Sequence, residues 1–578
     1  MNQIKIPELK RRYKSVLHKN FREFLNHIAI EYKDLTAFII KHKNKTEVTY
    51  EHITFHDFRN DVVAIGTAMA ERGWTGKRIA VVGKNSYNWM AAYFATLCGL
   101  GTSVPLDKDI TYEELESSLA RSYTDILVFD KSHAELVKRL QAESNTQVKE
   151  FVCMTELEGY TDTDMLRAEG KAASPEAIAN YMSLPIDEHA ITILLFTSGT
   201  TSMSKAVMLS QYNILSNIDS LVATEELLPG DVNMAFLPYH HTFGSTGQIL
   251  MLSCGITTTY CDGLKYLQKN IVEYKVSVFF CVPLLIESIY KKINTTIKKE
   301  GKEKTVAFGI KLSQFLLKFG IDIRRKVFKS IIDQLGGNLR FVISGASAID
   351  PEAIEGFNNF GIRAVQGYGM TEASPVLTAE NQFERRTGSI GHAMPGVDLR
   401  IDNPDEDGIG ELIARGPNVM AGYYENEEET AKTLADGWLH TGDLAYADKD
   451  GYVFICGRKK NVVVLKNGKN VYPEENEILI SNLPYVIENF VFGEPKRKDG
   501  DPDDLALCAK IVYDPAYMKE NHGAETQEAV EKIVRADIDK INKTLPPYKQ
   551  MMRIIVTDQP MIKTTTGKVK RYEETKNM

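Results

Sequence analysis

ILLFTSGTTSMSKAVM, residues 193 to 208, opens with an apolar run that predicts a buried strand. The run ends in five hydroxyl residues around Gly199, and Lys205 follows. Hydroxyl and backbone N–H groups can donate to phosphate oxygens, and lysine adds a positive charge, so the loop suits a polyphosphate. It is not a Walker A loop, because no glycine adjoins the lysine. An ordinary Ser/Thr-rich turn is the alternative.

Composition limits the class of protein. A chain of 578 residues is too long for one core, so two or more domains are expected. The net charge of −8 argues against a general nucleic-acid binder. Seven scattered cysteines without C-x-x-C fit reduced thiols and suggest no zinc site. The N-terminus lacks a signal-peptide core, and no apolar stretch reaches the about 20 residues of a bilayer span, so we expect a cytoplasmic protein.

Strand and helix patterns alternate through most of the chain. Apolar runs at 78–83, 126–129, 276–280 and 339–343 are separated by helical patterns, which predicts doubly wound α/β sheets. From about Val397 shorter β-rich pieces with glycine turns follow, predicting a small β-barrel-like part. A smaller α+β unit begins after Gly457, with helices expected near 474–482 and 527–542. We therefore expect a large N-terminal domain, 1–457, and a small mobile C-terminal domain, 458–578.

Three further stretches carry groups suited to a nucleotide. In QGYGMTE, 366–372, two glycines permit close approach of a ligand, Tyr368 can stack on a base, and Glu372 is a hard oxygen ligand for Mg²⁺. Asp443 lies on a turn and can accept from ribose hydroxyls. Lys568 lies in TTTGK near the C-terminus. Taken singly, each has a plain structural alternative: a core tyrosine, a turn former and a solvated charge.

Together and in this order, these stretches resemble the acyl-adenylate-forming (AMP-binding) superfamily, which includes long-chain fatty acyl-CoA synthetases. The resemblance runs from about Phe21 to Arg571 and rests on seven ordered motifs. These are TSGTTSMSK (197–205), LPYHHTFG (237–244), SGASAI (344–349), QGYGMTE (366–372), DGWLHTGD (436–443), GRKKNVVVLKNGKNVYPEENE (457–477) and KTTTGKVKR (563–571).

The resemblance implies a role for each matching residue. The catalytic set would be Lys568, bridging the acyl carboxylate and the α-phosphate, Thr371 on the α-phosphate, Glu372 on Mg²⁺, and His241 near the acyl group. Lys460 matches the hinge of the C-terminal domain. The residues implied to hold ATP are Thr197, Ser198, Gly199, Thr200, Thr201, Lys205, Gly345, Ala346, Ser347, Gln366, Gly367, Tyr368, Gly369, Asp443, Ile455 and Arg458. ATP and CoA would be substrates.

Some positions depart from the family pattern. Ser202, Ser204 and Ala206 replace residues that are usually glycine, proline and glycine, and His240 stands where an aromatic residue is common. Serine at 202 is tolerated if its φ stays negative, although flexibility is lost. These departures bear on loop dynamics and acyl fit, because the residues that match the family's chemical groups are present.

The acid and its acceptor are less determined. Gly367 matches a position where synthetases for acetate carry a bulky aromatic residue that closes the acyl pocket. A glycine at this position predicts an open acyl pocket. Segment 285–335 holds twelve basic and five acidic residues. Periodicity predicts two helical faces: an apolar one with Leu312, Phe315, Leu316, Phe319 and Ile323, and a basic one with Lys311, Lys318, Arg325 and Lys329. Such a helix either packs on the core or lies on an anionic membrane, such as the inner face of a cell membrane.

We expect a long-chain fatty acid–CoA ligase. An acyl–carrier-protein ligase, which would bind an acyl carrier protein, and an aryl or medium-chain acid CoA ligase remain open. So does a degenerate nucleotide- and lipid-binding protein, although intact Lys568, Glu372, Asp443 and Arg458 argue against it.

Overall fold

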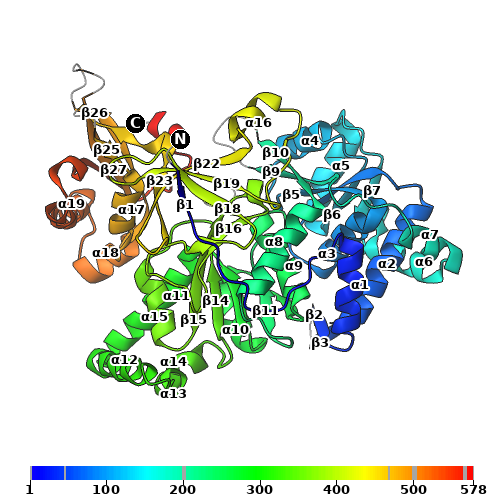
Figure 1. The fold of residues 1–578 in the computed structure, drawn as a ribbon, viewed down its shortest axis with the longest axis horizontal. Coiled ribbons are helices and arrows are strands. Elements are labelled where there is room, and N and C mark those ends of the chain that lie inside the picture. The colour runs from blue at the N-terminus through cyan, green and yellow to red at the C-terminus, as the bar shows by residue number, and fades with distance from the viewer. Residues whose placement is uncertain are drawn as a thin grey trace.

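A computed structural model of the chain describes residues 3–44, 47–197, 204–466, 469–496, 501, 504–563 and 569–576. Three sheets form the larger part, and a smaller unit with its own three-stranded sheet follows at one end (Figure 1). The predicted α/β class with doubly wound sheets and a small α+β C-terminal unit is confirmed. Among the described residues, no helix is both long and apolar enough to cross a bilayer.

The first sheet has eight strands in the order β20-β10-β9-β5-β4-β6-β7-β8. Its bounds are β4 Lys77–Val82, β5 Gly101–Leu106, β6 Ile126–Phe129, β7 Glu150–Cys153, β8 Thr161–Asp162, β9 Ile191–Thr197, β10 Lys205–Ser210 and β20 Gly422–Tyr423. The accompanying helices are α2 Phe55–Glu71, α3 Tyr87–Ala95, α4 Tyr112–Arg121, α5 Ala134–Glu143, α6 Thr163–Ala172, α7 Pro175–Met182 and α8 Gln211–Thr224. The β4–β7 strands are parallel, as strand–helix alternation predicts.

The second sheet has nine strands in the order β17-β16-β15-β14-β13-β11-β12-β2-β3. Its bounds are β2 Thr36–Lys43, β3 Val48–Thr54, β11 Val232–Ala235, β12 Thr257–Tyr260, β13 Val278–Cys281, β14 Phe341–Ser344, β15 Arg363–Gly369, β16 Val376–Ala379 and β17 His392–Ala393. Its helices are α1 Phe21–Glu31, α9 Thr242–Ser253, α10 Leu267–Glu273, α11 Pro283–Lys299, α12 Glu303–Leu317, α13 Arg324–Val327, α14 Lys329–Gln334 and α15 Pro351–Asn359. A core rich in aromatic side chains, including Trp89, Tyr93 and Tyr239, joins elements of both sheets.

The third sheet is largely antiparallel, with the order β1-β18-β19-β22-β21 and β23 paired to β22. Its bounds are β1 Gln3–Lys5, β18 Asp398–Asp402, β19 Gly410–Arg415, β21 Leu434–Ala435, β22 Trp438–Ala447 and β23 Val453–Arg458, with α16 at Glu427–Thr433. This sheet is the β-rich part that the glycine-punctuated sequence predicts.

The C-terminal unit has a hydrophobic cluster whose fully buried members lie between Val463 and Val556. Its strands are β24 Val463–Val464, β25 Asn470–Val471, β26 Val486–Pro495, β27 Leu505–Tyr513 and β28 Met551–Thr557. Its helices are α17 Pro473–Ser481, α18 Pro515–His522, α19 Gln527–Thr544 and α20 Arg571–Lys576. The helices predicted near 474–482 and 527–542 are confirmed as α17 and α19.

The helical segment after β13 differs from its prediction. The periodicity predicts one helical face continuing from Leu312 to Ile323, but α12 ends at Leu317. Gly320 takes a φ of +77°, and the N–H groups of Gly320 and Ile321 bond back to Leu317 and Leu316. A left-handed glycine with such bonds terminates a helix. The chain then makes two short helices, α13 and α14 (Figure 1).

Candidate active site

Strands β9 and β10 form the antiparallel hairpin that carries the opening motif. Thr197 pairs with Lys205 in register, and its hydroxyl donates to the Lys205 carbonyl over 3.3 Å. The strand predicted at 193–196 is confirmed as part of β9, in which Ile193, Leu194 and Leu195 are buried. Ser198, Gly199, Thr200 and Thr201 lie outside the described residues, so the phosphate loop itself stays a prediction.

Lys205 begins a chain of four polar side chains. Its ammonium group donates to the Glu429 carboxylate at the start of α16 and lies 5.0 Å from the centre of the Tyr423 ring. The Tyr423 hydroxyl donates in turn to Glu372 Oε1 over 2.7 Å. Burial and the Glu372 charge raise the pKa of Tyr423, which keeps it a neutral donor. The lysine expected at phosphate and the carboxylate expected at Mg²⁺ are thus linked through one tyrosine.

The carboxyl ends of β14 and β15 form the neighbouring wall. These parallel strands end at Ser344 and Gly369, and ligands of open α/β sheets bind beyond such ends. Gly345 is buried, and a Cβ there would lie 3.0 Å from the Phe243 ring and 3.4 Å from the Gly367 carbonyl oxygen. Ala346 has a φ of +77°, a conformation that clusters at functional sites, and Ser347 beside it is exposed.

Gly367 does not border open space as its sequence match suggests. A Cβ at this position would lie 3.2 Å from the Thr378 carbonyl oxygen of β16. At Gly369 the same construction falls 1.9 Å from the Pro375 carbonyl oxygen. The close approach of Pro375 therefore accounts for Gly369, and Thr378 of β16 leaves little room beside Gly367, so the missing side chain at 367 is not by itself an argument for a long acyl pocket.

Tyr368, Asp443 and Arg458 form a second polar group. The Tyr368 hydroxyl donates to Asp443 Oδ2 over 2.5 Å, and Arg458 Nε lies 2.7 Å from Asp443 Oδ1. The cross-strand register of β22 and β23 sets Asp443 opposite Arg458. Desolvation, followed by the Asp443 charge, raises the pKa of Tyr368. A carboxylate accepts hydrogen bonds at about four sites, a property that suits the two hydroxyls of a ribose.

Two other residues of the implied nucleotide set have structural partners. Gln366 is buried and its amide donates to the Ser389 carbonyl over 2.5 Å. Ile455 lies in β23 opposite Ala445 of β22. Gln366 therefore joins β15 to the segment before β17, whereas Ile455 belongs to the third sheet.

Lys460 lies in the 3₁₀ helix η5, Lys459–Asn461, directly after β23. Desolvation lowers its pKa, and the positive charges of Arg458 and Lys205 lower it further. These influences place Lys460 within electrostatic range of both polar groups. Arg571 of the C-terminal unit also lowers the pKa of Lys460, whereas Lys568 lies outside the described residues.

His241 is the N-cap of α9 and stands beside His240, with ring centroids 4.2 Å apart. His240 is buried, and its Nε2 lies 3.4 Å from Asp107 Oδ1. The position where the family commonly has an aromatic residue thus carries a histidine next to a carboxylate. On the next residue, Thr242 Oγ1 lies 3.5 Å from Thr371 Oγ1, which joins the LPYHHTFG and QGYGMTE motifs.

The residues around Glu372 fit a magnesium ion bound together with a nucleotide. Mg²⁺ is typically held by one or two carboxylates plus substrate phosphates and water. Glu372 supplies a carboxylate whose Oε1 accepts from Tyr423, and the preceding Thr371 begins the same 3₁₀ turn. Lys205 lies on the other side of Tyr423, where it can meet phosphate oxygens.

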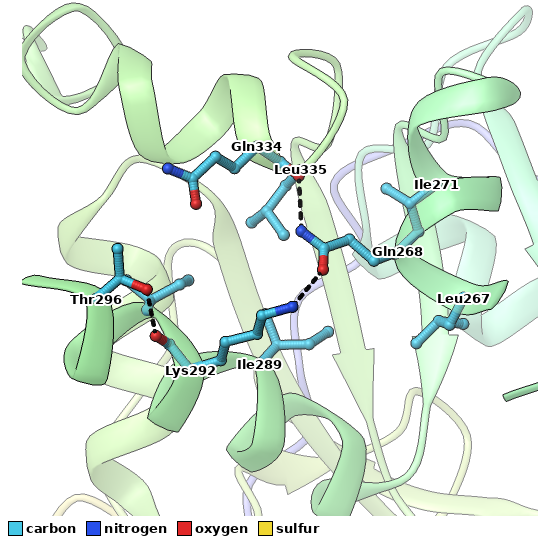
Figure 2. A pocket seen from close by; sticks show the side chains of 9 residues that line it. Leu267, Gln268, Ile271, Ile289, Lys292, Thr296, Gln334 and Leu335 are labelled. Atoms are coloured by element: carbon cyan, nitrogen blue, oxygen red, sulfur yellow. Dashed lines mark hydrogen bonds between the residues drawn. The ribbon is translucent and has the colours of Figure 1, made fainter. Parts of the chain in front are cut away.

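Two cavities differ sharply in character. One of about 430 Å³ adjoins Lys205 and is lined by charged groups that include Arg121, Glu429 and Lys432. The other, of about 50 Å³, lies between α10, α11 and α14 (Figure 2). There Lys292 donates to Gln268 over 2.7 Å, and Gln268 donates to the Gln334 carbonyl over 3.4 Å. This second cavity is too small for an acyl chain, since ligand pockets measure about 300–1,000 Å³.

Sequence reasoning missed Glu429, Tyr423 and Asp107. Glu429 meets a lysine 224 positions earlier, and Tyr423 meets a carboxylate 51 positions earlier. No local spacing encodes such pairs. The only usable signal was Gly422-Tyr423 in the β-rich region, because a tyrosine beside a glycine turn is a candidate for ligand contact.

Residues 27–424 match the family model of the AMP-binding enzymes, and the chain belongs to this family. It is 28% identical over 417 residues to the peroxisomal long chain acyl-CoA synthetase 7 of Arabidopsis thaliana, covering 66% of this chain and 59% of that protein. It therefore spans little more than half the length of this relative. Long-chain-fatty-acid–CoA ligase FadD15 of Mycobacterium bovis is 26% identical over 552 residues, with 88% and 90% covered.

The fold is also that of a solved acid–CoA ligase. The crystal structure of the anthranilate CoA ligase AuaEII in complex with anthranoyl-AMP superposes with a TM-score of 0.74. The match covers 97% of this chain and 98% of the ligase, at 19% sequence identity. At this identity the likeness supports the architecture.

Proposed function

We propose that this chain is an AMP-forming acid–CoA ligase. It would activate a carboxylic acid with ATP to an acyl-adenylate, and then pass the acyl group to CoA. One observation carries the proposal: the Lys205–Tyr423–Glu372 and Tyr368–Asp443–Arg458 groups flank the carboxyl end of β15. The first group suits a phosphate chain with its cation, and the second suits a ribose and base.

The first half-reaction brings together two anions. A carboxylate oxygen forms a bond to the α-phosphorus of ATP, and the bond from that phosphorus to pyrophosphate breaks. Lys205 and Lys568 would lower the repulsion, and Thr371 would orient the α-phosphate. A bound Mg²⁺ held by Glu372 would supply further charge neutralisation. Fixed charges of this kind are usually the largest contribution to catalysis.

The second half-reaction exchanges AMP for the thiol of CoA. The sulfur, after losing its proton, attacks the acyl carbonyl, and the bond to the AMP oxygen breaks. We place the domain boundary between Gly457 and Arg458 and the hinge at Lys460. Support comes from the separate cluster beginning at Val463 and from the charges of both polar groups acting on Lys460. Rotation there would withdraw Lys568 and admit the thiol.

The acid proposed is a long-chain fatty acid. The names of the relatives from Arabidopsis thaliana and Mycobacterium bovis support it. The fold shared with an anthranilate ligase keeps aryl acids as the second candidate. A medium-chain acid is a further candidate, and an acyl carrier protein is the alternative acceptor. We propose a cytoplasmic protein with peripheral membrane contact through 285–335.

A panel of acids tests the proposal. Purified protein is incubated with ATP, Mg²⁺, CoA and acids from acetate to oleate, with anthranilate and benzoate included, and both AMP and thioester are measured. We expect equal amounts of both products, with the highest kcat/KM for chains of about 14 to 18 carbons, since each buried methylene contributes about 0.8 kcal/mol. A higher kcat/KM for an aryl acid would contradict the long-chain fatty acid and make the aryl acid the assigned substrate. If no acid yields AMP, the proposal of an AMP-forming ligase is wrong.

A further inference from the structure

Helix α12 carries apolar residues on two opposite faces. Val306 and Ile310 face inward and pack against the hydrophobic cluster of the β13–β15 region, and Gly309 and Ser313 on the same side are buried. This inward stripe satisfies the usual requirement of an amphipathic surface helix. A second apolar stripe on the opposite side is not needed for the fold and requires a separate explanation.

The outer stripe consists of Phe308, Leu312, Phe315 and Phe319, spaced by four, three and four residues. This spacing places the first three on one helical face, and Phe319 follows just past the helix end. Their exposed fractions are 67%, 39%, 56% and 68%. The rings of Phe315 and Phe319 meet edge to face, with centroids 5.2 Å apart. Neighbouring large aromatic residues left in water mark an interaction surface.

Lysines line one edge of this stripe at seven-residue intervals: Lys304, Lys311 and Lys318. Within the described part of the chain, the side chains of these three lysines make no ion pair and no hydrogen bond. Two other lysines of the segment have acidic partners: Lys302 pairs with Glu300, and Lys329 pairs with Asp333. The lysines of the stripe therefore keep their charges available to an outside partner.

Arg325 corrects the earlier grouping of basic residues. Its guanidinium donates to the carbonyls of Leu339, Gly361 and Gly337, and desolvation lowers its pKa. It therefore fixes the α13 turn to the sheet and is not a surface charge. Lys311 and Lys318 remain from the predicted basic face, and Lys304 joins them.

We propose that the outer face of α12 docks on an anionic lipid bilayer. Phe308, Phe315 and Phe319 would enter the boundary between headgroups and acyl chains, and the three lysines would lie against anionic headgroups. Aromatic residues with flanking lysines are typical of interfacial helices. Protein interfaces, in contrast, are depleted in lysine. Only the role of this docking, which is to bring a poorly soluble acid to the enzyme, rests on the proposed function.

The docking face is separate from the nucleotide site. Helix α12 lies at the edge of the molecule, while β10, α16 and β22 lie toward the opposite edge (Figure 1). Substitutions on its outer face should therefore leave the chemistry of a water-soluble acid unchanged. This separation allows lipid binding and ligase activity to be measured independently.

Sedimentation with vesicles tests the proposal on the full chain. Vesicles of phosphatidylcholine with 30% phosphatidylglycerol are compared with pure phosphatidylcholine at low and high salt. We expect the wild-type chain to sediment with anionic vesicles at low salt, and high salt to reduce it. Since each lysine near an anionic surface contributes about 1 kcal/mol, K304Q/K311Q/K318Q should weaken partitioning at least about tenfold. F308S/F315S/F319S should weaken it similarly.

A matched control removes the same charge elsewhere. Lys532, Lys540 and Lys543 are exposed on α19, so K532Q/K540Q/K543Q should sediment like wild type. Phe315→Trp adds a direct probe, whose emission should shift to the blue only with anionic vesicles.

Failure of the wild-type chain to sediment, or equal losses in the α12 and α19 variants, would overturn the docking face. Thermal melting checks that each variant folds. If vesicles bind while no acid yields AMP, the ligase proposal fails and the docking face stands.

Discussion

The nucleotide site and the outer face of α12 treat charge in opposite ways. At the site, Lys205 is paired with Glu429, Arg458 with Asp443, and Tyr423 with Glu372. On α12, three lysines lie beside exposed phenylalanines and make no ion pair within the described residues. The site has arranged its charges internally, so a ligand must replace existing partners. The lysines of the α12 face have no acidic partner among the described residues, so we expect their counter-charge to come from another molecule.

The difference has an energetic basis. Asp443 is buried and Lys205 is largely so, and an unpaired charge in such surroundings is costly. Lysines at the molecular surface remain hydrated and need no partner, and exposed ion pairs contribute only about 0–1 kcal/mol. Internal pairing therefore identifies groups held ready at a fixed position. Exposed apolar residues next to unpaired lysines identify a surface that suits an extended partner such as an anionic bilayer.

The largest effect is expected at Glu372. Glu372→Gln keeps the shape of the side chain but removes the charge that would hold Mg²⁺. We expect kcat/KM for acid-dependent adenylation to fall on the order of 100-fold, because fixed charges of this kind carry much of the catalysis. Tyr423→Phe is the matched control, since it removes only the 2.7 Å hydrogen bond, and should cost less than about tenfold. Near-normal activity of Glu372→Gln would contradict the assignment of this carboxylate as the Mg²⁺ ligand.

A smaller effect of opposite sign is expected at Glu429. If this carboxylate occupies Lys205 until phosphate arrives, Glu429→Gln should lower the KM for ATP by about threefold, the value of a weak ion pair. Glu428→Gln makes the same charge change one residue away, where the partner is Lys432, and should leave the KM unaltered. A raised KM in Glu429→Gln would show that the glutamate orients the lysine, and the contrast between the two regions would weaken.

The smallest effect concerns a buried carboxylate in neither region. Desolvation raises the pKa of Glu225 to about 8, although Arg363, 3.9 Å away, opposes the rise. The folded state then binds this proton more tightly than the unfolded state. Its contribution to stability is therefore fully present below about pH 4.5 and is lost as pH rises toward about 8.

Glu225→Gln should abolish this dependence. Its melting temperature should exceed that of wild type by roughly 2 °C at pH 8.5, with a smaller difference at pH 5.5. Glu226→Gln, a half-exposed neighbour, is the control and should show no such trend. A difference that grows toward low pH would contradict the assigned pKa shift.

The sequence predicted what short-range patterns encode. The strand predicted at 193–196 lies within β9, and α17 and α19 lie where the helical patterns near 474–482 and 527–542 place them. The pairing of Asp443 with Arg458 follows from two strands close in sequence. The ion pair of Lys205 with Glu429 could not be predicted in this way. It depends on how β20 and α16 return to the first sheet after more than 200 residues.

Helix α12 shows a different limit of sequence reasoning. The apolar spacing continued past Leu317, but Gly320 carried the signal that the helix ends, and its left-handed φ explains the stop. Periodicity also could not tell which of two apolar stripes faces the core. Only the packing of Val306 and Ile310 on the sheet's cluster identified Phe308 and Phe315 as the outer residues.

Acid-dependent exchange of labelled pyrophosphate into ATP, without CoA, tests the central claim most directly. Exchange requires a reversible acyl-adenylate and therefore reports the first half-reaction alone. We predict exchange that depends on a long-chain fatty acid and on Mg²⁺, and that falls on the order of 100-fold in Glu372→Gln. Exchange absent with every acid of the panel, in protein that melts cooperatively and binds ATP, would contradict the account and leave a nucleotide-binding protein without ligase activity.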